Sequence, residues 1–157
     1  MVKKVYTHSQ ALAKAQKTCA YQERCQSEML QKIISWGMSE EESLEVIADL
    51  ISEGFINEER YAKAFVAGKF KIKHWGRNKI IAELKKKKIS SPCIQSGLKE
   101  IDEEQYRKVL KKLILKKSEE VKGKNAIEKK HKTIRYLLGR GYEYDSIKEG
   151  IESVWEK

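Results

Sequence analysis

A pattern of apolar residues that recurs three times at helical spacing is the feature that most constrains this chain. Position 37 aligns with position 88 at an offset of 51, and position 88 aligns with position 141 at an offset of 53. Five apolar columns then match without gaps: Leu30/Ile81/Ile134, Ile33/Leu84/Leu137, Met38/Ile89/Tyr142, Ile47/Leu98/Ile151 and Leu50/Ile101/Val154. Because residues three and four apart share one face of a helix, each copy predicts a helix, a break and a second helix.

One further column does not match, since Ser43 stands against Ile94 and Ile147. We expect the neighbouring Leu44 to fill the space that the serine leaves in the first copy. Strand-like alternation is nearly absent, and the single proline, Pro92, fits the first turn of a helix. These observations favour an all-helical chain.

Capping residues and glycines divide each copy into three helices. The segments 7–10, 39–42 and 102–105 fit capping boxes, in which the first and fourth residues each bind a free backbone N–H of the other. The expected helices cover residues 7–21, 27–36, 39–52, 58–71, 77–87, 90–101 and 102–117. Two more follow a polar connection at 118–124 and are separated by Gly139-Arg-Gly141.

The predicted fold class is therefore all-α, with three tandem three-helix repeats that form an elongated, curved array. Such repeats bury one another's faces, so we also expect a concave surface. The predicted domains are a basic N-terminal tail over 1–6 and repeats over 7–56, 57–101 and 102–157.

The stretch from Glu53 to Tyr61 is the predicted junction between the first and second repeats. Gly54 can end a helix in a left-handed conformation, and Asn57 is a suitable N-cap for the next helix. Phe55 is expected to pack back onto the preceding helix. The candidate junction residues are Gly54, Phe55, Asn57 and Tyr61, of which Gly54 and Phe55 should set the angle between the repeats.

The charge of the chain changes sign at this junction. Residues 40–60 hold eight acids and one base, whereas residues 69–88 hold nine bases and one acid, and the whole chain carries +10. A second basic stretch runs from Arg107 to Arg135. A polyanionic partner is therefore expected: nucleic acid, a nucleoprotein or an acidic protein surface. The candidate contact residues of this basic face are Lys69, Lys71, Lys73, His74, Arg77, Lys79, Lys85, Lys86, Lys87, Lys112, Lys116, Lys130 and Arg135. The alternative is a solvated lysine face on ordinary helices.

Aromatic side chains alternate with bases between Lys69 and Arg77. Phe70 or Trp75 could stack on a nucleotide base. We favour the interpretation that Phe70, Ile72 and Trp75 pack where one helix gives way to the next. For His74 we expect a hydrogen bond at a helix end rather than a pH-dependent switch.

Cysteine usage and motif searches exclude several classes of function. The three cysteines form no C-x-x-C pair, which argues against a disulfide framework or a zinc site, and Cys19 is expected in the core. The sequence has no P-loop, no H-E-x-x-H and no nucleophile elbow, so we expect no enzymatic activity. It also has no run of 18 apolar residues, no signal peptide and no lipidation motif, which favours a reducing cytoplasm.

The segments 50–62, 65–66, 74–76, 79–84 and 88–89 together resemble the RecX family, the bacterial regulators of the RecA recombinase. The resemblance covers residues 27–102, and the flanking units match mainly by pattern. Asn57 stands where the family has Asp, which keeps the cap chemistry. Lys88 stands where Gly is usual, so the turn before Ile89 should be less favourable.

This resemblance implies a small all-helical modulator that binds along the groove of the RecA–DNA filament. Proteins of this family block filament extension, strand exchange, ATP hydrolysis and the LexA-cleavage co-protease activity, and they need no metal or cofactor. It therefore implies a negative regulator whose partner is the RecA filament on single-stranded DNA. We further expect weak non-specific DNA binding, no membrane contact and a monomer.

Two other functions stay open from the residues themselves. A three-helix unit can place one helix in a major groove as a helix-turn-helix does, and the helices between Ile80 and Ile101 are the candidates. The helix of this pair that carries Lys85 to Lys88 has few Asn, Gln or Arg side chains, which argues against the recognition of base edges. A structural helical adaptor that binds another protein through its acidic first unit is the third possibility.

Overall fold

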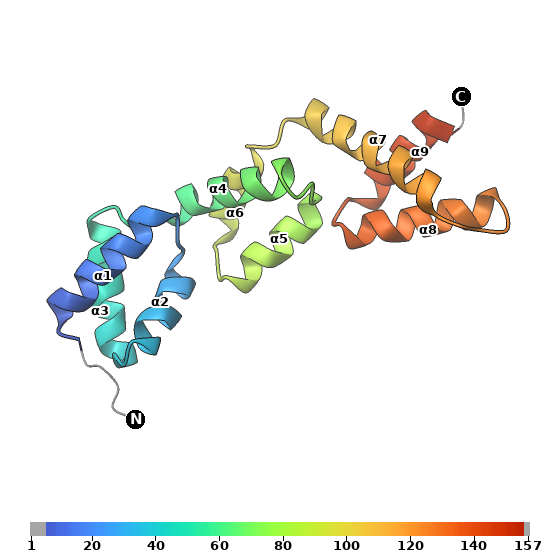
Figure 1. Cartoon of the computed structure of the whole chain (residues 1–157). Coiled ribbons are helices and arrows are strands. Elements are labelled where there is room, and N and C mark those ends of the chain that lie inside the picture. Colours follow the sequence, from blue (N-terminus) through green and yellow to red (C-terminus); the bar gives the residue numbers. More distant parts are fainter. Residues whose placement is uncertain (1–5, 156–157) are drawn as a thin grey trace. The chain divides into compact units, whose positions relative to one another are not determined.

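The computed structural model describes residues 6–155, and within this range the chain forms nine α-helices and no strand (Figure 1). The helices are α1 (His8–Tyr21), α2 (Gln26–Ser35), α3 (Glu40–Ser52), α4 (Glu58–Lys71), α5 (Arg77–Lys86), α6 (Ser91–Leu98), α7 (Glu103–Glu120), α8 (Ala126–Gly139) and α9 (Tyr144–Trp155). The all-α fold class is confirmed. Of the tail expected over 1–6, only Tyr6 lies among the described residues, and the partition into repeats at 7–56, 57–101 and 102–157 stays a prediction.

The helix starts follow the capping signals. The hydroxyl of Thr7 accepts from the amide of Gln10 at 3.2 Å, and the side chain of Gln10 accepts from the amide of Thr7 at 3.0 Å. Ser39 and Glu42 form the same reciprocal pair at the start of α3. Asp102 accepts from the amide of Gln105 at 3.0 Å. Each cap satisfies amides that a helix leaves without an internal partner, so these helices begin where the sequence predicts.

The turn between the second and third helices recurs at the predicted register. Gly37 and Gly141 have φ of 98°, and Lys88, at the equivalent position, has φ of 62°. All three residues are therefore left-handed, a conformation that costs a side-chain-bearing residue free energy because its Cβ approaches the carbonyl oxygen. This geometry supports the expectation that Lys88 makes the turn less favourable.

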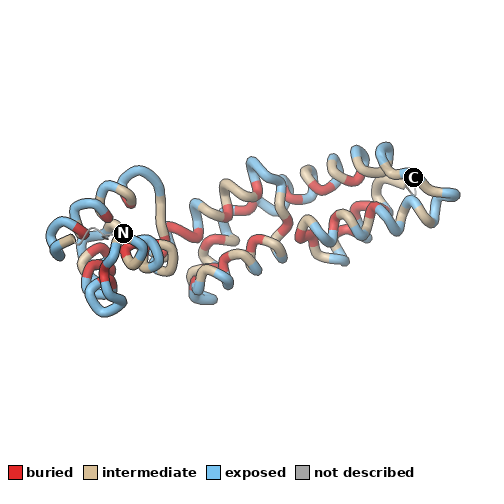
Figure 2. The backbone as a smooth tube through the Cα atoms, turned by 60° about the horizontal axis from the view of Figure 1, so that its bottom comes forward, coloured by how far each residue is buried: buried red, intermediate tan, exposed pale blue. Residues whose placement is uncertain are grey.

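The chain divides into two compact units. Unit 1 consists of Met1–Ala64 and Leu84–Gly97, and unit 2 of Phe65–Glu83 and Leu98–Lys157. In unit 1, α1, α2 and α3 pack against one another. Their core comprises Ala11, Ala15, Cys19, Met29, Ile33, Met38, Val46, Ile47, Leu50 and Ile56. Figure 2 shows that the buried residues form stripes along the helices and that none of the described helices is buried all round. This is the pattern of helices with one narrow apolar face.

In unit 2, α7 packs against both α8 and α9. Leu110, Ile114, Leu137, Ile147 and Ile151 are all buried between these helices. An aromatic cluster joins the end of α4 to them, since the ring centroid of Tyr106 lies 5.6 Å from that of Phe70 and 5.1 Å from that of Tyr142. The predicted packing role of Phe70 is confirmed.

Three predictions about local structure are wrong. Leu44 is 49% exposed, because α3 turns Val46 into the core instead, and Ser43 is fully buried without help from Leu44. The hydroxyl of Ser43 donates to the carbonyl of Ser39 at 2.6 Å, which satisfies it inside the core. Ile72 is 75% exposed. The connection expected at 118–124 begins later, because α7 continues to Glu120.

Candidate polyanion-binding surface

Each unit contains a polar contact between the second helix of one repeat and the repeat that follows. In unit 1, the hydroxyl of Ser27 at the start of α2 donates to the carbonyl of Lys87 at 2.7 Å. The amide of Gln26 donates to the carboxylate of Glu58, in the first turn of α4, at 3.3 Å. The hydroxyl of Tyr61 donates to Glu28 Oε1 at 2.5 Å. These bonds fix the position of the first turn of α4 and of the turn after α5 against α2.

Glu28 is charged at neutral pH although it is half-buried. Burial by itself raises the pKa of this carboxyl, but the hydrogen bonds from Tyr61 and Cys25 and the charges of Lys87 and Arg24 outweigh it, so the pKa is lowered. Burial and the bond to Glu28 raise the pKa of Tyr61 above its ordinary range. The pair therefore stays a neutral phenol and a carboxylate.

Unit 2 contains the equivalent contact. The amide of Gly76 donates to the carbonyl of Arg140, and the amide of Asn78 donates to the carbonyl of Gly141, both at 2.8 Å. The offset of 51 carries Ser27 to Asn78, and the offset of 53 carries Lys87 to Arg140. The same position of the second helix therefore receives the same turn of the next repeat in both units.

A second correspondence was missed by the sequence reasoning. The first helices of the second and third repeats begin Asn57-Glu-Glu-Arg-Tyr61 and Asp102-Glu-Glu-Gln-Tyr106, which align at an offset of 45. Both tyrosines are buried, and both donate to a carboxylate at 2.5 Å. The signal lay in the sequence, but it is displaced by several residues from the register of the other two helices.

Arg77 is held inside unit 2. Its guanidinium pairs with Glu103 and with Glu143, the latter at 3.0 Å, and lies 4.0 Å from the centroid of the Tyr106 ring. Only 20% of its side chain is exposed. Burial lowers the pKa of Arg77, but the hydrogen bonds to Glu143 and Glu103 more than compensate and raise it. Arg77, which was predicted as a contact residue, therefore also joins two carboxylates within unit 2 through ion pairs.

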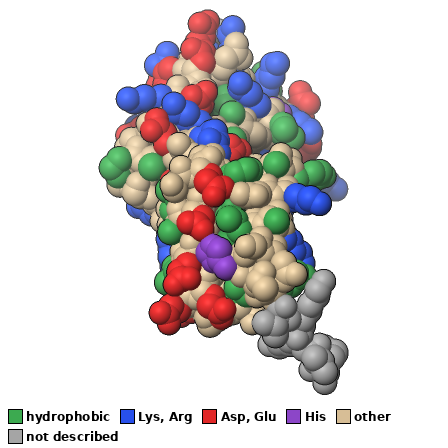
Figure 3. Space-filling model, turned by 90° about the vertical axis from the view of Figure 1, so that its left-hand side faces the viewer, with side chains coloured by type: hydrophobic (Ala, Val, Ile, Leu, Met, Phe, Trp, Pro, Cys, Tyr) green, Lys and Arg blue, Asp and Glu red, His purple; other side chains and the backbone are tan. Residues whose placement is uncertain are grey.

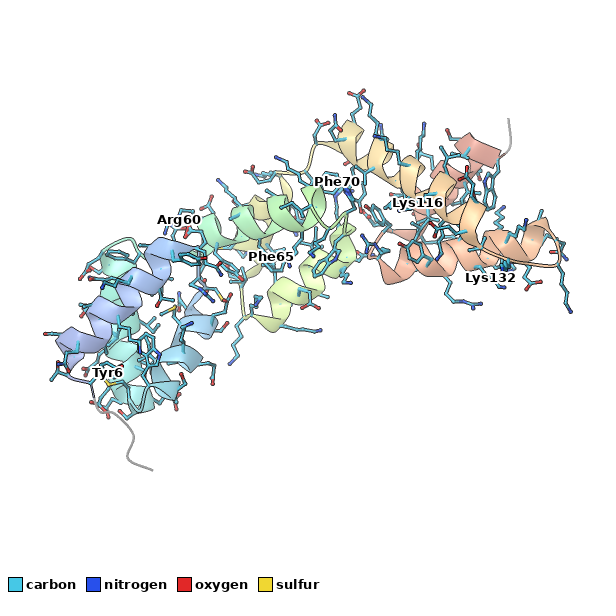
Figure 4. All side chains as sticks on the ribbon, in the orientation of Figure 1. Tyr6, Arg60, Phe65, Phe70, Lys116 and Lys132 are labelled. Atoms are coloured by element: carbon cyan, nitrogen blue, oxygen red, sulfur yellow. The ribbon has the colours of Figure 1, made fainter. Side chains whose placement is uncertain are left out.

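Trp75 lies among side chains of its own unit. The ammonium groups of Lys69 and Lys79 lie 4.9 and 4.4 Å from the centroid of one of its rings, and Phe65, labelled in Figure 4, meets the ring edge-on at 6.5 Å. The lysines therefore bind Trp75 through cation–π contacts. This arrangement favours packing over stacking on a base.

The other predicted contact residues divide by exposure. Lys87 is half-buried and lies 3.5 Å from Glu28. Lys69, Lys79 and Lys130 are also half-buried. The exposed ones are Lys71, Lys73, His74, Lys85, Lys86, Lys112, Lys116 and Arg135. His74 lies just after the end of α4 and makes the expected hydrogen bonds there, since its amide donates to the carbonyl of Phe70 and its carbonyl accepts from the hydroxyl of Tyr142 at 2.8 Å.

The positive charge is concentrated in unit 2. This unit holds 21 of the 33 basic residues and 13 of the 23 acidic ones, a net charge of +8 out of +10. On α7, Lys112 and Lys116 are exposed on one side, and Lys116 is labelled in Figure 4. Figure 3 shows acidic side chains gathered on the lower part of the visible face of unit 1. A polyanion would therefore be attracted chiefly to unit 2.

The junction residues are joined by one arginine that the sequence reasoning did not select. The guanidinium of Arg60 donates to the carbonyls of Gly54 and Phe55 at 3.0 and 3.3 Å and pairs with Glu23. Asn57 caps α4 by accepting from the amide of Arg60 at 2.8 Å. Gly54 is left-handed, with φ of 79°. Arg60 (Figure 4) thereby fixes the bend that Gly54 begins.

Within residues 6–155 no three His, Cys, Asp or Glu side chains come together as a metal site. In the same range, no helix has the length and apolar character needed to cross a membrane. Cys19 and Cys25 are buried free thiols, and burial raises the pKa of each. The core position predicted for Cys19 is confirmed.

Comparison with known proteins follows the same division into three-helix units. A family model described as the second three-helix domain of RecX matches residues 57–98, and one described as the third three-helix domain of RecX matches residues 103–151. Together these matches cover more than half of the chain. Tandem three-helix domains of this type define a class of helical repeat proteins, and this chain belongs to the RecX family.

Individual relatives agree with this assignment. A protein of Lactobacillus johnsonii named regulatory protein RecX is 28% identical over 141 residues, which cover 90% of this chain and 52% of the relative. A protein of the same name from Clostridium perfringens is 31% identical over 124 residues, which cover 78% of this chain and 58% of the relative. The chain thus spans between half and three fifths of the length of these two relatives.

The fold is also found in a solved structure. The crystal structure of RecX from Lactobacillus salivarius superimposes with a TM-score of 0.83 over 94% of this chain and 96% of that chain, at 24% sequence identity. The helical repeat architecture is therefore shared with a protein whose sequence has diverged widely.

Proposed function

We propose that this chain is a negative regulator of the RecA recombinase that binds the RecA–DNA filament and inhibits its ATP hydrolysis, strand exchange and co-protease activity. It acts in the cytoplasm as a monomer, by binding rather than by catalysis, and without a metal or cofactor. Its membership of a family of regulatory proteins supports the proposal. The observation that carries it is the charge of unit 2, which offers +8 and exposed lysines to a polyanionic filament.

The contact surface proposed within unit 2 consists of exposed basic residues on two stretches. Lys71, Lys73 and His74 lie at the end of α4, and Lys112 and Lys116 lie along α7. In unit 1, Lys85 and Lys86 are exposed basic residues that we propose as separate contacts. Naked DNA should bind weakly and in a strongly salt-dependent manner, because these contacts go to phosphates.

The experiment that tests the proposal measures ATP hydrolysis by RecA on single-stranded DNA in the presence of the purified chain. We expect inhibition at substoichiometric amounts, since a protein that caps or lines a filament affects many subunits. The double variant Lys71→Glu, Lys73→Glu should inhibit less than the variant Glu40→Lys, Glu41→Lys, which alters exposed acids of α3. Unchanged hydrolysis at equimolar protein contradicts the proposal.

Direct recognition of duplex DNA is the other candidate function, and α6 would be the recognition helix of its helix-turn-helix. This helix has only eight residues, and Gln95 is its one exposed amide side chain. Such a surface has little capacity to read base edges. Tight, salt-insensitive and sequence-specific binding to duplex DNA would support this function over regulation of RecA.

A further inference from the structure

The third repeat carries a groove at the position where each of the other repeats meets its successor. In unit 1 a cavity of about 470 Å³ remains at that position. Its α2 side is formed by Gln26, Ser27, Leu30 and Gln31, and its opposite wall by Glu58 and residues 86–88 of the next repeat. The offsets of 51 and 53 carry the four α2 residues to Lys130, His131, Ile134 and Arg135. All four line a groove of about 530 Å³ on α8.

The two occupied positions show what this face of a second helix receives. In each case it is a helix start with an Asx cap, two glutamates and a tyrosine, namely 57–61 in unit 1 and 102–106 in unit 2. Its first glutamate contacts the beginning of the second helix, Glu58 at Gln26 and Glu103 at Arg77. Its tyrosine is buried in the contact. The docking element is thus acidic at its tip and aromatic one turn later.

The floor of the α8 groove is apolar and is not needed to hold α8 in place. Ile127 is 67% exposed, Leu138 45% and Tyr144 55%. The helix is held in unit 2 by a different face, on which Thr133 and Leu137 are fully buried. Apolar residues of this size are normally removed from water by a neighbour when they form a contiguous stripe. This stripe therefore has the character of an interface.

The rim of the groove is basic. Lys130 occupies the register position of Arg77, whose guanidinium binds Glu103 in unit 2. Arg135 is exposed one turn further along α8. Arg77 is the first residue of α5. Its equivalent, Lys130, comes four residues after the start of α8 at Ala126, so the amide of residue 130 lies inside the helix. The acids of an incoming segment would therefore be met by side chains of the rim rather than by backbone amides.

We propose that the α8 groove is a docking site for a protein partner that presents an acidic helix start followed by an aromatic side chain. Charge complementarity with the rim and equivalence to the two occupied positions support this occupant. A second copy of this chain does not fit, because both of its helix starts of this type are already used internally, with Tyr61 6% and Tyr106 1% exposed. The inference does not depend on RecA as the partner.

Titration of the ¹⁵N-labelled full chain with a peptide tests this site by NMR. The probe is the peptide of residues 102–114 with Arg107, Lys108, Lys111 and Lys112 replaced by Gln, which keeps the acidic start and the tyrosine. We expect amide shifts to change in residues 127–138 and at Tyr144, with a Kd on the order of 10⁻⁴ M. The chain variant Ile127→Ser, Arg135→Glu should weaken binding about tenfold, which corresponds to roughly 1.4 kcal/mol.

Three controls test whether binding is specific to this groove and to this kind of peptide. The chain variant Lys99→Glu, which alters an exposed base in the turn after α6, should bind the probe normally. A peptide in which Tyr106 is replaced by Ala and both glutamates by Gln should bind at least tenfold more weakly than the probe. Equal binding of the two peptides, or no shift at about 2 mM probe, overturns the proposal. So does an oligothymidine that shifts the same residues at lower concentration, because the groove would then be a nucleic-acid site.

Discussion

The hydroxyl of Tyr106 donates a 2.5 Å hydrogen bond to Oε1 of Glu143 and accepts the amide of Arg77 at 3.0 Å. In unit 1, Tyr61 donates to Glu28 at the same distance. Both tyrosines lie in the first turn of the first helix of a repeat, and both are buried. A phenol is well suited to this place because its ring fills an apolar contact while its hydroxyl donates to a half-buried carboxylate.

Replacement of Tyr106 by Phe should lower the free energy of unfolding by about 1–3 kcal/mol. The substitution keeps the ring but leaves the amide of Arg77 and one oxygen of the half-buried Glu143 without their partner. Urea unfolding followed by circular dichroism measures the change. Tyr144→Phe is the matched control, since Tyr144 is 55% exposed and should change the value by less than about 0.5 kcal/mol. Equal effects of the two substitutions would contradict the assignment.

The same bond should make stability depend on pH in the alkaline range. Burial and the bond to Glu143 raise the pKa of Tyr106 above the ordinary value of 10.0. A group whose pKa is higher in the folded state contributes its full stability below the unfolded pKa and loses it as pH rises. The difference between the wild-type chain and Tyr106→Phe should therefore be constant up to about pH 10 and shrink above it. Urea unfolding of both proteins from neutral to alkaline pH measures this, and a widening difference would refute it.

Gly76→Ala should destabilise unit 2 by more than about 2 kcal/mol. A Cβ at Gly76 would overlap the backbone of Gly141 and Tyr142, at the point where the two repeats approach most closely. The backbone at Gly76 and the backbone at Gly141 cannot move apart without breaking the hydrogen bond from the amide of Gly76 to the carbonyl of Arg140. Thermal unfolding detects the loss.

Gly68→Ala provides the control within the same unit. Gly68 lies in the last turn of α4, and a Cβ there would meet nothing within 4 Å. Alanine has the higher helix propensity by about 1 kcal/mol, so this variant should be stabilised. Destabilisation by both substitutions to a similar extent would show that the close approach at Gly76 is not specific.

Lys88→Gly should stabilise the chain by about 0.5–1 kcal/mol. Lys88 has φ of 62°, while its register equivalents Gly37 and Gly141 are glycines in the same conformation. Glycine relieves the steric cost of the left-handed backbone, although part of the gain is lost to its greater freedom in the unfolded chain. Lys88→Ala, which keeps a Cβ, should not be stabilised. The melting temperatures of both variants decide the matter, and stabilisation by alanine would point to charge rather than backbone strain.

The sequence predicted the helices well because their ends are determined locally. Thr7, Ser39 and Asn57 cap the helices that they were expected to cap, and Gly54 has the expected left-handed conformation. Which residue of a stripe faces the core was less predictable. Leu44 and Val46 differ by two positions in one helix, and their burial depends on the angle at which α1 and α2 pack against α3.

The residues of the candidate site were predicted from their charge alone, without knowledge of what each side chain packs against. Lysine and arginine look alike in a charge count, yet Arg77 is enclosed by two carboxylates and Lys71 is exposed. The partners of Arg77 lie 26 and 66 residues away in the sequence. Such pairings follow from the packing of repeats and not from any local pattern. The assignment of individual contact residues therefore stays a prediction that only binding measurements can test.

Neutralising Lys71 and Lys73 should reduce the salt dependence of single-stranded DNA binding. Each phosphate contact that is lost lowers the slope of log K against log salt by about 0.7, so Lys71→Gln, Lys73→Gln should lower it by about 1.4. Lys17→Gln, Lys32→Gln changes two equally exposed lysines of α1 and α2, in the acidic first repeat, and should leave the slope unchanged. Fluorescence anisotropy at several salt concentrations measures both. If the two double variants lose the same slope, the basic face has no preferred role, and phosphate binding is spread over the whole surface of the chain.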